Sequence, residues 1–155
     1  MQYIRPRLTY PLLCSSLTQQ QCRHIQAPAF AALLPKLHLN RHTPHAVIFG
    51  EPRFGGLYLP DLYTDQGYGQ LRLLLGHLRK RDDTGQLILI AISHLQLLLG
   101  SVTPFFALPY PHYARWIDQN WLTAIWKHTA QIRMLVEVEY HWLPTIPREH
   151  DQMLM

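Results

Sequence analysis

A leucine stripe in the middle of the chain constrains the fold more than any other sequence feature. Leu71, Leu74, Leu75 and Leu78 fall at positions i, i+3, i+4 and i+7, the spacing of one face of an α-helix. Residues 60–81 are therefore predicted to form an amphipathic helix, which needs a second apolar element to cover that face. Most cations of this segment lie off the stripe near its C-terminal end, where the helix dipole favours them.

The next segment provides such an element. Asp82, Asp83 and Thr84 are residue types that cap the N-terminus of a helix, which we expect to run to Gly100. Residues 87–99 are apolar around most of the circumference of that helix. A helix of this kind is usually central in a bundle or wedged between partners.

Two further helices are predicted, one on each side of this pair. Thr18 and Gln21 have the spacing of a capping box and begin a helix that Pro28 should kink or divide. Another long helix is expected over residues 113–140, although residues 134–138 could instead form a strand. The large apolar side chains on or near one face of that helix are Trp116, Ile117, Leu122, Ile125 and Trp126.

A short β-prone region separates the first helix from the leucine stripe. Residues 46–50 and 57–59 are β-prone, and the residues between them favour turns. A small hairpin or an extended connector is therefore predicted over residues 46–59. The expected fold class is mainly α, a bundle of three to five helices. We expect one helical unit over residues 1–155, with a possible sub-boundary near residues 44–60.

Charge is scarce and unevenly distributed. Asp, Glu, Lys and Arg make up 15% of the chain, against about 25% in a typical soluble domain. Either Gln and His replace the missing charge, or another domain normally covers part of the surface. Residues 1–50 contain five Lys or Arg and no acid. This excess suits a phosphate backbone, although a solvated basic face without a ligand is the simpler explanation from charge alone.

No combination of residues indicates a catalytic or metal centre. Cys14 and Cys22, with several histidines nearby, lack the paired short spacings of a zinc site. Asp82 and Asp83 follow three basic residues and precede Thr-Gly, which favours a helix start over the magnesium site of a polymerase. No serine lies in the context of an activated nucleophile. We therefore expect no enzymatic activity, no cofactor and no metal.

The chain carries no recognisable signal for secretion or membrane insertion. Arg5, Pro6, Arg7 and Pro11 interrupt the apolar stretch nearest the N-terminus. Residues 87–99 are too few to span a bilayer. Two cysteines fit a reducing compartment and cannot form a disulfide framework. These features predict an intracellular protein of the cytoplasm or nucleus with no membrane partner.

Aromatic residues are concentrated in the C-terminal third. Exposed aromatic rings can stack on nucleic-acid bases, but aromatic residues at helical spacing more often belong to a core or an interface. The second interpretation is favoured here. The residues concerned are Trp116, Trp121, Trp126, Trp142, Tyr110, Tyr113 and Tyr140.

Three stretches, which together span nearly the whole chain, resemble one family. Residues 32–50 contain Ala-Leu-Leu-Pro-Lys-Leu, Asn-Arg-His-Thr-Pro and Val-Ile-Phe-Gly, and residues 54–62 read Phe-Gly-Gly-Leu-Tyr-Leu-Pro-Asp-Leu. Residues 121–151 contain Trp-Leu, Ile-Trp, Trp-Leu-Pro and Arg-Glu-His-Asp. The chain resembles the region immediately downstream of the polymerase domain in non-LTR-type retroelement reverse-transcriptase proteins, particularly those of diatoms and other algae.

The most widely shared part of this resemblance is a Gly-Gly-Leu element, here Gly55, Gly56 and Leu57. The usual pattern continues with another glycine, where this chain has Tyr58. The resemblance implies a helical thumb or linker, part of a larger polyprotein, that contacts a template–primer duplex or neighbouring domains. The catalytic aspartates of the family lie upstream, and no residue here matches their motif.

We therefore expect a non-catalytic accessory fragment whose partners are RNA or an RNA–DNA hybrid and the polymerase domain of the polyprotein. The alternative is a protein-interaction module that packs its apolar helices against a polymerase domain or a second copy. Phosphate contacts, which position a nucleic acid without reading its bases, are expected from Arg23, Lys36, Arg41, Arg72, Arg79, Lys80 and Arg81.

Overall fold

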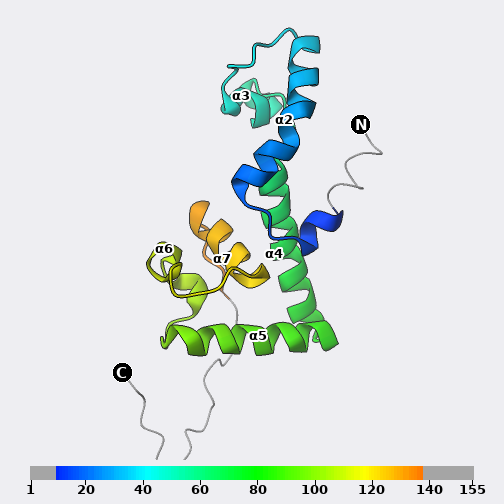
Figure 1. Ribbon diagram of the computed structural model, residues 1–155. Coiled ribbons are helices and arrows are strands. Elements are labelled where there is room, and N and C mark those ends of the chain that lie inside the picture. The colour runs from blue at the N-terminus through cyan, green and yellow to red at the C-terminus, as the bar shows by residue number, and fades with distance from the viewer. Residues whose placement is uncertain (1–9, 138–155) are drawn as a thin grey trace, which may run out of the picture. The chain divides into compact units, whose positions relative to one another are not determined.

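The computed structural model describes residues 10–137, and this part of the chain is mainly helical, as predicted, with no strand (Figure 1). The chain divides into two compact units, Met1–Gln70 and Leu71–Met155. The boundary falls inside helix α4 (Leu62–Lys80), so the sequence of one helix contributes to both units.

The first unit is built on α2 (Gln19–Lys36) and the first turns of α4. Thr18 and Gln21 form the predicted capping box at the start of α2. Pro28 was predicted to kink or divide the helix, and it does not divide it, because α2 continues through Pro28 to Lys36. Its small apolar cluster consists of Leu12, Cys22 and Leu62.

Buried glutamine side chains form hydrogen bonds that connect the segments of this unit. Gln66 accepts hydrogen bonds from the Ser15 hydroxyl and the Leu17 amide, both at 3.2 Å, and donates to the Leu17 carbonyl at 3.0 Å. Gln70 donates to the Ser15 carbonyl. Gln26 donates to the Pro60 carbonyl at 2.8 Å. Polar side chains therefore hold backbone segments in place where the apolar cluster is too small to do so.

The predicted hairpin over residues 46–59 does not form, because its first half is helical and Tyr58 in its second half has a left-handed φ of 51°. Residues 46–50, expected to be β-prone, lie mostly in a short helix, α3 (His45–Phe49), which is followed by a 3-10 turn, η1 (Pro52–Phe54). β-propensity expresses packing on a pleated surface, and the described part of the chain offers no neighbouring strand. The helical turn instead buries Ile48 and brings Phe49 edge-on to Phe30, with ring centroids 5.7 Å apart.

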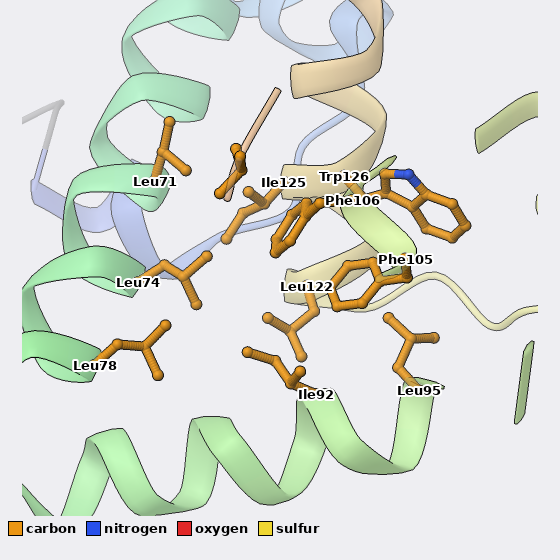
Figure 2. Packing of buried hydrophobic residues seen from close by; sticks show 11 residues of the cluster. Leu71, Leu74, Leu78, Ile92, Leu95, Phe105, Phe106, Leu122, Ile125 and Trp126 are labelled. Carbon is orange, nitrogen blue, oxygen red and sulfur yellow. The ribbon is translucent and has the colours of Figure 1, made fainter. Parts of the chain in front are cut away.

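The second unit contains the end of α4 and the helix α5 (Asp83–Leu99), both close to their predicted bounds. The short elements η2 (Phe105–Ala107) and α6 (Tyr110–Tyr113) follow, and then α7 (Trp121–Gln131). Figure 2 shows side chains from α4, α5, η2 and α7 pointing toward one another. This core consists of Leu71, Leu74, Leu78, Ile92, Leu95, Phe105, Phe106, Leu122, Ile125, Trp126 and Val136.

The prediction of a single long helix over residues 113–140 is wrong. A turn around residues 114–119 separates α6 from α7, because Asn120 caps α7 in a capping box with Thr123. Helix α7 ends at Gln131, and residues 134–137 form neither helix nor strand. Predictions for residues 138–155 lie outside the described part of the chain.

Two buried polar side chains fix the loops of the second unit. Gln96 accepts a hydrogen bond from the Phe105 amide at 3.0 Å and donates to the Thr103 carbonyl at 2.7 Å. The indole of Trp126 donates to the Leu108 carbonyl at 2.9 Å and packs edge-on against Phe105. The loop between α5 and α6 is therefore tied to α5 through Gln96 and to α7 through Trp126.

Candidate nucleic-acid interface

Four of the predicted phosphate contacts lie in the C-terminal half of α4 and the residue that follows it. Arg72, Arg79, Lys80 and Arg81 are exposed, and within residues 10–137 none of them forms an ion pair. The leucine stripe explains their exposure, because burial of Leu71, Leu74 and Leu78 turns the opposite face of α4 to solvent. Leu75, predicted to belong to the buried stripe, is instead 43% exposed.

The end of α4 is held in a defined conformation by the turn into α5. Arg81 adopts a left-handed conformation with φ of 54°, and its amide donates to the His77 carbonyl at 3.0 Å. Gly85 is required by a close approach, since a Cβ there would lie 2.4 Å from the His77 carbonyl oxygen. The last turn of α4 and the first turn of α5 therefore pack directly against each other.

Asp82 is the polar centre of this turn. Its carboxylate accepts hydrogen bonds from the Gly85 amide and the His77 ring, each at 2.8 Å. The bond from His77, followed by the bond from Gly85, lowers the pKa of the Asp82 carboxyl below its usual value. Asp82 is thus the N-cap of α5, as the sequence predicts, and its charge is engaged in holding the turn.

The three predicted contacts of the first unit do not form a comparable group. Arg23 and Lys36 are 13 residues apart on α2, which places them about 20 Å apart along the axis and roughly 220° apart around it. Arg41 lies after the helix, where its guanidinium donates to the His42 ring at 3.1 Å. These cations are exposed but dispersed.

The Gly-Gly-Leu element forms a turn that satisfies the end of α3. Gly55 takes a left-handed conformation with φ of 79°. Gly56 needs its hydrogen side chain because a Cβ would lie 2.0 Å from the Gly50 carbonyl oxygen. The Leu57 amide then donates to the Val47 carbonyl at 2.8 Å. This geometry is a structural turn and presents no arrangement of free amides for a phosphate.

Tyr58 occupies a conformation that glycine prefers. Its φ is 51°, in the left-handed region, while its amide donates to the Gly50 carbonyl at 2.9 Å. The glycine that the resemblance implies at this position would adopt this conformation without steric cost. The Tyr58 side chain itself is 63% exposed.

Among the described residues, no group of three or more His, Cys, Asp or Glu side chains is placed to hold a metal ion. Cys22 is fully buried, and this burial, together with the nearby Asp61 carboxylate, raises the pKa of its thiol. A thiol whose pKa is raised is a poor nucleophile. Cys14 is exposed.

One exposed pair was missed by the sequence analysis. Trp116, predicted on the buried face with Trp126, is 73% exposed, and the Arg115 guanidinium lies 4.8 Å from its ring centroid. The break before α7 explains the difference, because residues 114–119 leave the helical register. An exposed indole beside an arginine can stack on a base. The adjacent Arg-Trp in the sequence was the available signal.

Helix α5 carries a second apolar face. Ile92 and Leu95 point into the core, whereas the opposite side of the helix is exposed and contains no Lys, Arg, Asp or Glu between residues 84 and 100. Four leucines and isoleucines of that side are between 62% and 78% exposed. We refer to this surface as the outer face of α5, and its members are Leu87, Ile90, Ala91, His94, Leu97 and Leu98.

Within residues 10–137, no helix has both the length and the apolar character needed to cross a membrane. Comparison with known proteins gives no relative: no family model, no curated protein and no solved structure matches this chain.

Proposed function

We propose that this chain is a non-catalytic accessory segment, similar to the thumb or linker of a retroelement reverse transcriptase, that binds the phosphate backbone of a nucleic acid. The observation that carries the proposal is the group of four exposed cations in the C-terminal half of α4 and the residue that follows it. Cations without carboxylate partners are available to a ligand, and their attraction to phosphates does not depend on base sequence.

The fixed turn between α4 and α5 supports this proposal. A flexible basic tail would have to be ordered on binding, at a cost in conformational entropy. Here the hydrogen bonds of Asp82 and the close approach at Gly85 fix the backbone beneath Arg79, Lys80 and Arg81. The second unit has seven Lys or Arg and four Asp or Glu among residues 71–137, which adds a net positive field.

The test is fluorescence anisotropy of the full chain with a labelled RNA–DNA hybrid over a series of salt concentrations. Binding should weaken steeply with salt, because each phosphate contact releases counterions. In the double variant Lys80→Glu with Arg81→Glu, affinity should fall and the slope of log K against log salt should decrease by about 2. The matched control is Arg23→Glu with Lys36→Glu, which makes the same charge change at dispersed positions and should have a smaller effect.

Unchanged affinity and slope in the Lys80/Arg81 variant would exclude the end of α4 as the contact surface. Circular dichroism of the variant distinguishes lost binding from lost structure. Equal losses in the two double variants would mean that net charge alone attracts the nucleic acid, without a localised site.

The outer face of α5 favours a second candidate function, a protein-interaction module. An uncharged apolar helix face of this length is costly to leave in water. Because the face is uncharged, a second copy could pack against it without electrostatic repulsion. Sedimentation equilibrium should then show self-association that is abolished in the double variant Leu87→Gln with Leu98→Gln. A monomer at high concentration would count against this function and leave the nucleic-acid proposal intact.

A further inference from the structure

Gly76 lies at the centre of the basic group, in the interior of α4. The nearest neighbours of a residue on a helix surface are those three and four positions away. For Gly76 they include Arg72, Arg79 and Lys80, so three of its four surface neighbours are cations. We call Gly76 together with these three cations the α4 saddle.

Packing and backbone conformation do not account for this glycine. A Cβ at Gly76 would meet nothing within 4 Å, and its φ is not positive. By contrast, a Cβ at Gly56 or Gly85 would lie within 2.0 or 2.4 Å of a backbone oxygen. Gly76 is partly buried, and glycine in a helix interior destabilises the helix relative to alanine, so its presence here calls for a different explanation.

We infer that the α4 saddle binds the sugar–phosphate backbone of a nucleic acid. The nucleic acid would approach the helix backbone at Gly76, which we call the floor of the saddle, and contact the three surrounding cations, which we call its rim. Glycine permits a ligand to approach the helix backbone more closely than any other residue. The space over Gly76 is open, so the rim side chains do not fill it. A phosphate above Gly76 would be within reach of cations on both sides along the helix axis.

The spacing of the rim fits a polyanion better than a single anion. Arg72 and Lys80 are eight residues apart, about 12 Å along the axis. Each strand of a duplex carries a phosphate about every 3.4 Å of the duplex axis, so a duplex whose axis runs parallel to α4 places about three phosphates of one strand along the length of the saddle. Arginine can contact phosphate with two parallel hydrogen bonds, while lysine acts as a point charge.

This inference rests on the proposed function but makes a separate prediction, because Gly76 carries no charge. The variant Gly76→Gln fills the floor of the saddle and leaves every cation in place. It also replaces a poor helix former with a good one, so the melting temperature should rise by about 2–4 °C. Affinity for the labelled RNA–DNA hybrid should nevertheless fall by about tenfold, with a salt slope lower by about 2.

Two further variants complete the experiment. Gly76→Ala adds a single methyl group and should stabilise the helix while causing a smaller loss of affinity. Ser93→Gln, a matched control at an exposed position of the helix α5 that has no Lys or Arg, should bind like the wild type. All variants are measured as the full chain, and their structure is checked by circular dichroism.

The outcomes separate the two proposals. If the wild type shows salt-dependent binding and Gly76→Gln binds equally well, the saddle is overturned while the proposed function stands. If the wild type does not bind the hybrid, both are overturned. Binding to vesicles that contain phosphatidylserine, without binding to the hybrid, would overturn both in favour of a lipid surface.

Discussion

The two units of this chain are stabilised in different ways. The first has an apolar cluster of three buried residues and relies on glutamines that bond to the backbone of neighbouring segments. The second has eleven buried apolar residues in one cluster, with Trp126 and Phe105 fully buried. Apolar burial is non-directional and scales with area, whereas each buried glutamine must keep its partners. Loss of structure should therefore follow different substitutions in the two units.

The largest effect is expected from Trp126→Ala in the second unit. The indole is fully buried, packs against Phe105 and Tyr110, and donates to the Leu108 carbonyl. Its removal should cost about 3–5 kcal/mol in the free energy of unfolding. Urea denaturation followed by amide hydrogen exchange will show whether protection is lost over residues 71–137.

Trp116→Ala is the matched control, because the same side chain is removed from a position that is 73% exposed. Its effect should stay within about 0.5 kcal/mol. Equal destabilisation by the two substitutions would show that residues 114–119 are packed in solution, contrary to the structure.

A smaller effect is expected from Gln66→Leu in the first unit. The substitution adds apolar surface at a position that is 2% exposed, yet it removes the partner of the Leu17 amide and carbonyl. Buried backbone groups left without a partner cost about 1–3 kcal/mol. Hydrogen exchange at Leu17 reports the loss directly. If Gln66→Leu were neutral or stabilising, the first unit would depend on packing in the same way as the second.

These differences indicate which parts of the fold could be predicted from the sequence. The end of α4, the Asp82 cap and the end of α5 at Gly100 were predicted correctly, because caps and apolar spacing act within one or two turns. The break before α7 was not, since Asn120 is an acceptable residue inside a helix as well as a good cap.

The candidate site likewise has features that could be predicted from the sequence and features that could not. The four cations in and just after the C-terminal half of α4 are close in sequence, so their grouping was predictable. The open space over Gly76 and the exposure of Trp116 depend on which side chains pack elsewhere, which a single sequence does not specify. The outer face of α5 could not be predicted either. Residues 87–99 are apolar on nearly all sides of the helix, so only packing in the core determines which side is buried.

A pH effect should distinguish the turn between α4 and α5 from the first unit. The pKa of Asp82 is lowered in the folded state, first by the bond from His77 and then by the bond from Gly85. Its stabilising contribution is therefore complete above the carboxyl's ordinary pKa of 3.8 and is lost as the pH falls through the lower folded value. Thermal unfolding of wild type and Asp82→Asn across pH 2–5 should show a smaller pH dependence in the variant. Identical pH profiles would mean that Asp82 does not couple to folding.

The smallest effect, and one of opposite sign, is expected from Tyr58→Gly in the first unit. A non-glycine residue in the left-handed region costs about 1 kcal/mol, and the exposed Tyr58 ring offsets little of this through packing. Glycine removes the strain but increases the entropy of the unfolded chain, so a net gain of about 0.5 kcal/mol is expected. The control Tyr68→Gly, in the interior of α4, should instead destabilise the protein by about 1 kcal/mol. Slower hydrogen exchange at the Leu57 and Leu59 amides in Tyr58→Gly would assign the gain to the turn, and a loss of stability would show that the ring of Tyr58 is packed in solution.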